Sequence, residues 1–155
     1  MGEAIHLELR FSNLARTEYT VTSPKSQEYN CFAWVAGECA ARTQRERERW
    51  WQPTPEDEFY WVESVPRSET LSAYIQAYQT LGYTSCESEI LETGYEKIAL
   101  YVDDRGVPVH AAKQLPNGKW SSKLGWLEDI EHELEGLIGE RYGKVGQILK
   151  RVSQT

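Results

Sequence analysis

The sequence predicts an α+β fold, and three patterns carry that prediction. Apolar residues from Leu71 to Leu81 recur at the spacing of an amphipathic helix. Residues 97–123 have the pattern of three short strands joined by two tight turns. The tail, from residue 127 onward, has the spacing of two further helices. Helices packed on a small antiparallel sheet are therefore expected.

Composition limits the size of the domain and the class of partner. With 155 residues, 40% of them hydrophobic, residues 1–155 are expected to form a single domain. A net charge of -7 argues against nucleic acid as a partner, because nucleic-acid binders carry a concentrated basic face. No run is long and apolar enough for a membrane span, and no signal peptide is recognisable, so no membrane is expected. A cytoplasmic location is the expectation, with signal-independent export as the alternative.

Cysteine and histidine usage predicts reduced thiols and no cofactor. The three cysteines have neither the even count of a disulfide scaffold nor the spacing of metal ligands. The three histidines are too scattered to predict a zinc site, so no metal is expected.

The first half of the chain is expected to contain a strand, a loop and a helix. Residues 5–11 alternate apolar and polar positions, which suits a half-buried strand, and a helix start is the alternative for so short a segment. Residues 20–28 have a loop composition around Pro24, and a helix is predicted over residues 30–42. Residues 43–66 combine charges, prolines and aromatics, which indicates an ordered loop.

The second half contains the clearest elements. A helix is predicted after Ser68, ending at Gly82. Strands are predicted at 97–103, 107–115 and 119–123, with an Asn-Gly turn at 117–118 that suits a tight hairpin. The tail is expected to form helices over 127–138 and 142–152, broken at Gly139.

Cys31 is the strongest candidate for chemistry. It follows Asn30 at the predicted start of a helix, where unpaired N–H groups and the helix dipole favour thiolate over thiol. His110, in the predicted strand 107–115, could act as its base. The alternative is that Cys31 is a small buried hydrophobe and His110 a core histidine.

Several motifs give the chain a resemblance to known families. They are Tyr29-Asn30-Cys31-Phe32-Ala33-Trp34, Trp50-Trp51, Glu96-Lys97-Ile98-Ala99-Leu100-Tyr101, His110-Ala111-Ala112 and Ser122-Lys123-Leu124-Gly125. With these motifs the chain resembles a bacterial family of unknown function. More distantly it is similar to the NlpC-type branch of papain-like thiol peptidases, which implies a papain-like fold with a Cys-bearing helix packed on the sheet.

The remote resemblance also implies roles for individual residues. Tyr19 lies twelve residues before Cys31, as a tyrosine does in those peptidases, and with the Cys31 N–H it would stabilise an oxyanion. Asn30 stands where an aspartate is usual. The third polar position, commonly a histidine, falls on Ser122, and either Ser122 or Gln114 would orient His110.

The remaining candidates are weaker. Trp50, Trp51 and Trp61, with Tyr60, could roof a substrate groove, although a core role for some of them is the alternative. Cys39 is expected in the core and Cys86 in a polar loop. His132 is expected to be a solvated helix residue, and it is the fallback base if His110 faces away from Cys31.

Together, these observations predict a cysteine hydrolase or acyltransferase that acts on an amide, peptide or thioester bond through a Cys31 acyl-enzyme. The substrate would be a peptide, a protein or a small amide, and a protein partner or inhibitor is a further expectation. An effector or toxin, a phage-related hydrolase and a cytosolic peptidase all fit this class. The alternative is a non-catalytic module that keeps the fold and binds a peptide or protein.

Overall fold

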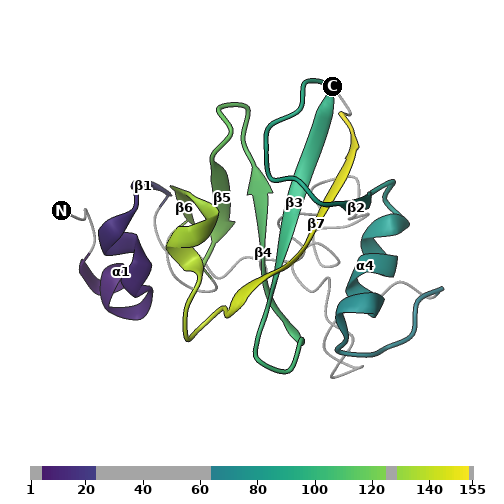
Figure 1. Ribbon diagram of the computed structural model, residues 1–155, viewed down its shortest axis with the longest axis horizontal. Helices are drawn as coiled ribbons and strands as arrows, with labels where there is room; N and C mark the ends of the chain where they lie inside the picture. The colour runs from purple at the N-terminus through teal and green to yellow at the C-terminus, as the bar shows by residue number, and fades with distance from the viewer. Residues whose placement is uncertain (1–4, 24–63, 125–128, 154–155) are drawn as a thin grey trace.

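The structure is built on one antiparallel sheet of seven strands (Figure 1). The computed structural model describes residues 5–23, 64–124 and 129–153. The strand order is β1-β6-β5-β4-β3-β7-β2. The bounds are β1 Tyr19–Ser23, β2 Thr84–Cys86, β3 Tyr95–Val102, β4 Pro108–Gln114, β5 Trp120–Lys123, β6 Asp129–His132 and β7 Lys144–Val152.

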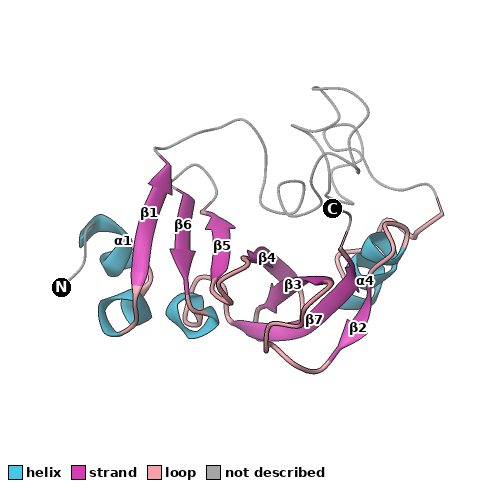
Figure 2. Ribbon diagram, turned by 90° about the horizontal axis from the view of Figure 1, so that it is seen from above, coloured by secondary structure: helices cyan, strands magenta, loops and turns pink. Residues whose placement is uncertain are grey.

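The helices of the described residues are short. They are the α-helices α1 Ile5–Arg10 and α4 Leu71–Gln79 and the 3₁₀ helices η1 Ser12–Arg16 and η3 Leu134–Leu137. The longest has 9 residues, so this part of the chain is mainly β. The prediction of an α+β, papain-like fold is therefore wrong. Figure 2 shows α1 at the β1 end of the sheet and α4 at the β2 end.

The central meander confirms the sequence prediction. Strands β3, β4 and β5 follow one another in the sheet and are joined by tight turns. Gly118 has a φ of 88°, a conformation that glycine adopts without steric cost, and its N–H donates to the Leu115 carbonyl. The Asn117 side chain accepts from the Lys119 N–H, which closes the same turn.

Helix α4 also confirms its prediction. The Thr70 side chain accepts from the Ala73 N–H and caps the start of the helix. The buried face carries Tyr74, Ala77 and Tyr78 with Ala73, which matches the predicted helical spacing.

The two helices predicted for the tail are wrong. Residues 129–152 form β6, the short helix η3 and β7 instead. Strand β7 pairs with β3 on one side and with β2 on the other, so it lies inside the sheet. Because both of its faces are partly covered, its sequence lacks the strict alternation that would have indicated a strand.

The N-terminal predictions are also corrected. Residues 5–10 form α1, in which Leu7 is buried and is followed at helical spacing by buried Phe11 and Leu14. The alternation over residues 5–11 therefore came from a helix start. Residues 19–23 form β1, which pairs with β6, although a loop was predicted for residues 20–28.

One face of the sheet carries a hydrophobic cluster. Residues of α1, η1 and η3 belong to this cluster together with apolar side chains of the central strands. The buried members are Leu7, Phe11, Leu14, Cys86, Ala99, Tyr101, Ala112, Trp120, Leu124, Ile130, Leu134, Leu137 and Ile148. The candidate site lies within this face.

Candidate functional site

Three polar side chains meet on the core face, one from each of the neighbouring strands β4, β5 and β6. His110 Nε2 lies 2.9 Å from Ser122 Oγ, and the same oxygen lies 2.6 Å from His132 Nε2. The pairing register of β4, β5 and β6 explains why these three side chains lie together. Trp120 pairs with Gln114 on one side and with His132 on the other, and residues two or four positions along a strand share its face.

The hydrogen bonds fix the tautomers of both imidazoles. His132 Nδ1 lies 2.7 Å from the Glu133 carbonyl oxygen, which can only accept, so this nitrogen carries a proton. In a neutral ring His132 Nε2 then accepts, and the Ser122 hydroxyl donates to it. The Ser122 oxygen in turn accepts from His110 Nε2–H. The network therefore leaves His110 Nδ1 as an unprotonated nitrogen with a lone pair.

Burial keeps both rings neutral. His110, Ser122 and His132 are each 0% exposed. Desolvation lowers the pKa of His132 to about 4, against the effect of its hydrogen bond to Glu133. Desolvation, with a smaller contribution from His132, holds the pKa of His110 well below its ordinary value of 6.5. At neutral pH the pair is therefore uncharged, and His110 Nδ1 is available as a base.

His110 Nδ1 is buried and has no hydrogen-bond partner among the described residues. A buried acceptor without a partner is costly, and catalytic groups are among the recognised reasons for keeping one. Gln114 could have been the orienting residue, but its amide nitrogen donates to the Glu89 and Gly118 carbonyls. Of Gln114 and Ser122, it is Ser122 that bonds to the His110 ring.

The Tyr142 ring covers one face of the His110 imidazole. The Tyr142 ring stacks on the imidazole with centroids 4.0 Å apart and an interplanar angle of 3°. Tyr142 belongs to a loop closed by reciprocal backbone hydrogen bonds between Gly139 and Gly143. Gly143 has a φ of 66°, and a Cβ there would collide with the Val102 carbonyl oxygen. Only glycine allows this loop to press Tyr142 against His110.

The remaining predicted site residues fall into two groups. Cys31, Asn30, Trp50, Trp51 and Trp61 lie outside the described residues, as does Cys39. The Tyr19 hydroxyl, proposed as an oxyanion donor, donates to Glu8 Oε2 at 2.6 Å.

Sequence reasoning assigned His132 and Cys86 to the wrong environments. His132 was expected on a solvated helix, but it is fully buried on β6. The sequence signal was weak, because Asp129-Ile130-Glu131-His132 alternates in polarity over only four residues, and in the structure Ile130 and His132 are the buried positions. Cys86 lies on β2 rather than in a polar loop, and it is buried.

Fold and site together define a mainly β domain with a buried histidine–serine–histidine network. The chain belongs to a family described as a domain of unknown function (DUF7689), whose sequence profile matches residues 20–150. Searches of curated proteins and of solved structures find no match. The remote similarity to NlpC-type peptidases gains no support from these comparisons.

Within residues 5–23, 64–124 and 129–153, no helix is long and apolar enough to cross a membrane. The same residues contain no group of three or more histidine, cysteine, aspartate or glutamate side chains that could hold a metal ion.

Proposed function

We propose that this protein is a cysteine hydrolase or acyltransferase in which His110 is the base for the Cys31 thiol. The supporting observation is the unprotonated His110 Nδ1, which has no hydrogen-bond partner in the part of the chain that the structure describes, while Ser122 orients the Nε2 of the same ring. Cys31 enters from the sequence, as a thiol at a predicted helix start. Its substrate is an amide, peptide or thioester, and a reduced thiol suits a cytoplasmic setting.

The reaction begins with proton transfer from the Cys31 thiol to His110 Nδ1. The sulfur attacks the substrate carbonyl carbon, and the resulting tetrahedral intermediate collapses when His110 returns the proton to the leaving group. Water or another acceptor then attacks the acyl-enzyme, again with His110 as base. Because burial lowers the pKa of His110, this proposal has the imidazole acting as a general base rather than as half of a preformed ion pair.

Ser122 and His132 are the positioning residues in this mechanism. Since the Ser122 proton is directed to His132, the Ser122 oxygen is free to accept from His110 Nε2–H. The same bond strengthens when His110 becomes an imidazolium, because a charged donor bonds more strongly than a neutral one. The Tyr19 hydroxyl donates to Glu8, so the backbone N–H of Cys31 remains as the oxyanion donor of the proposal.

Thiol labelling tests the proposal. In a background where Cys39→Ser and Cys86→Ser leave only Cys31, iodoacetamide should label the protein rapidly at pH 6 to 7. His110→Ala should slow labelling by about a hundredfold or more, as expected when a general base is lost. His110→Gln is the second variant, because it removes the base while filling more of the buried volume. Unchanged labelling in both variants, with the fold retained by circular dichroism, would refute the proposal.

One observation favours a non-catalytic binding module instead. All three members of the network are completely buried, and a neutral hydrogen-bonded chain of this kind can serve only to specify the core. In that case His110→Ala would lower the melting temperature, and Cys31 would label slowly in both the parent and the variant.

A further inference from the structure

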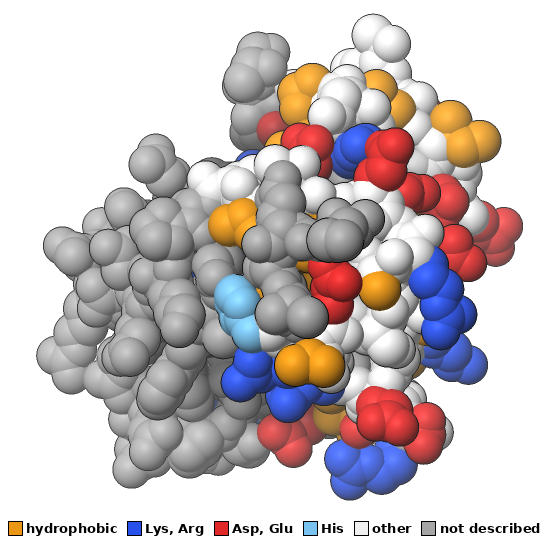
Figure 3. All heavy atoms as spheres, turned by 90° about the vertical axis from the view of Figure 1, so that its left-hand side faces the viewer, with side chains coloured by type: hydrophobic (Ala, Val, Ile, Leu, Met, Phe, Trp, Pro, Cys, Tyr) orange, Lys and Arg blue, Asp and Glu red, His pale blue; other side chains and the backbone are white. Residues whose placement is uncertain are grey.

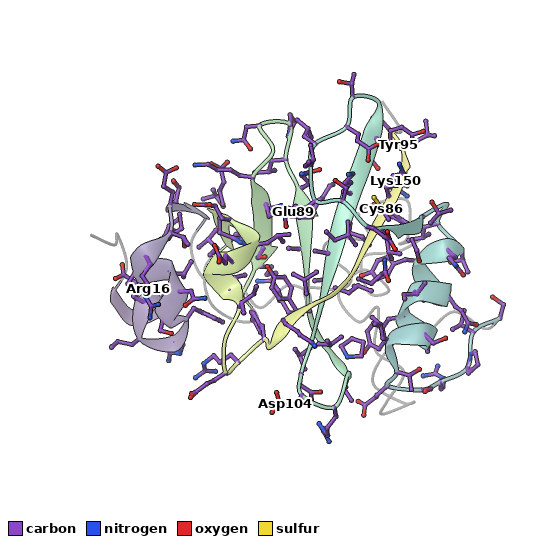
Figure 4. All side chains as sticks on the ribbon, viewed as in Figure 1. Arg16, Cys86, Glu89, Tyr95, Asp104 and Lys150 are labelled. Atoms are coloured by element: carbon purple, nitrogen blue, oxygen red, sulfur yellow. The ribbon has the colours of Figure 1, made fainter. Side chains whose placement is uncertain are left out.

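A groove of about 1050 Å³ opens on the surface, with Trp120 of the core face in its lining. It lies between the loop of residues 87–92 and η3. Its apolar lining includes Trp120, Leu134 and Val145, and Val145 pairs with Tyr101 in the sheet. In Figure 4 Glu89 projects over the central strands, whereas Tyr95 and Lys150 lie at the far end of β3 and β7. Burial raises the pKa of Tyr101, and the negative charge of Glu89 makes a smaller contribution in the same direction.

One wall of the groove is a loop held from beneath by a buried lysine. Lys97 Nζ, with a side chain 0% exposed, donates to the carbonyls of Ser88 at 2.8 Å and Ile90 at 2.6 Å. It also forms a salt bridge of 2.7 Å with Glu92. The Gln114 amide donates to the Glu89 carbonyl at 2.8 Å. These bonds fix the loop backbone before any ligand arrives, which lowers the entropic cost of binding.

The fixed loop presents apolar side chains to solvent. Ile90 is 72% exposed and Leu91 is 42% exposed, and both line the groove. An exposed aliphatic pair on a rigid loop beside an apolar floor is a feature of binding surfaces. Figure 3 shows exposed hydrophobic side chains next to acidic ones on the side of the molecule seen from the α1 end.

The charged side chains that line the groove indicate the charge of the ligand it would bind. Four carboxylates line it, from Glu18, Glu89, Glu133 and Glu135, against the two ammonium groups of Lys119 and Lys144. Glu18 is paired with Lys119 at 3.0 Å. Glu89, Glu133 and Glu135 form no salt bridge within residues 5–23, 64–124 and 129–153.

We infer that this groove binds an extended basic peptide in which arginine or lysine alternates with apolar residues. Apolar side chains of the peptide pack between Leu91 and Trp120, and the cationic ones pair with Glu89, Glu133 and Glu135. The site does not depend on the chemistry proposed for Cys31.

Fluorescence anisotropy of two labelled hexapeptides, one alternating leucine with arginine and one alternating leucine with glutamate, tests the inference on the full chain. The arginine peptide should bind at least about tenfold more tightly than the glutamate peptide, and its affinity should fall as salt rises. Glu89→Lys should weaken it by about tenfold. Glu87→Lys is the matched control, because Glu87 is an exposed neighbour that does not line the groove.

Three outcomes would overturn the inference: no binding of the arginine peptide, equal binding of both peptides, or equal effects of Glu89→Lys and Glu87→Lys. Binding that persists while Cys31 labels slowly and independently of His110 would reject the proposed chemistry and leave the groove established.

Discussion

Two polar clusters lie on the same face of the sheet, and they compensate for the loss of solvent in opposite ways. His110, Ser122 and His132 form a neutral chain in which each donor has a defined acceptor. Lys97 and Glu92 form a charged pair, in which the lysine side chain is buried and the glutamate is partly exposed. The first cluster avoids the cost of buried charge by staying neutral, and the second offsets it with hydrogen bonds.

The difference determines which cluster can exchange protons. The hydrogen bonds from Lys97 and Lys150 hold the pKa of Glu92 below its ordinary value of 4.5, so this carboxylate stays charged at neutral pH. Burial lowers the pKa of both histidines, to about 4 for His132, so both rings are neutral at neutral pH. The neutral network is thus suited to proton transfer, and the charged cluster to holding the loop of residues 87–92 in place.

Of the three changes considered, disrupting the Lys97–Glu92 cluster should lower the free energy of unfolding most. Lys97→Met removes the donor that bonds to Ser88 and Ile90 and leaves both carbonyls unsatisfied, so it should lower the free energy of unfolding by about 4 kcal/mol. Urea denaturation measures this change. Lys150→Met is the control, since Lys150 also pairs with Glu92 but is partly exposed, and it should cost far less. Equal losses in the two variants would show that the buried ammonium does not hold the loop.

Protonation of the histidine network at low pH should have the second-largest effect on the free energy of unfolding. The folded pKa of His132 is about 4, below the ordinary value of 6.5, so its contribution to stability is complete above pH 6.5 and is lost as the pH falls towards 4. The loss should approach roughly 3 kcal/mol for this residue alone. Urea denaturation between pH 7.5 and 4.5 measures it, and His132→Gln should flatten the curve. A slope that His132→Gln leaves unchanged would assign the pH dependence to other groups.

Removing the hydroxyl at the centre of the network should have the smallest effect of the three. Ser122→Ala leaves His110 Nε2–H and His132 Nε2 without their shared partner, which should cost about 2 kcal/mol in the free energy of unfolding. Ser121→Ala, at a neighbouring buried serine on the opposite face of β5, should cost less than about 1 kcal/mol. Thermal denaturation of both variants gives the comparison. Equal costs would mean that the network contributes nothing specific.

The candidate site could be predicted in part. The sequence selected His110 and placed Ser122 beside it, through the hairpin rhythm of residues 110–122 and the resemblance, and the two side chains are hydrogen-bonded. It named His132 only as a fallback base on a solvated helix, because residues 127–138 were expected to form a helix. Tyr19 was selected by its spacing from Cys31 alone, and spacing along the chain does not decide where a hydroxyl points. In the fold that hydroxyl donates to Glu8.

The sequence by itself determined the elements whose information is local. Helix α4 carries its own cap at Thr70 and its own apolar stripe, and the hairpin between β4 and β5 carries its turn at Asn117 and Gly118. Only the tertiary structure decided β1, β6 and β7. Each of these strands forms by pairing with a distant partner, as Tyr19 does with His132, and lies where burial overrides local propensity. The histidine network exists only once β6 has joined the sheet, so the sheet had to be known before the site.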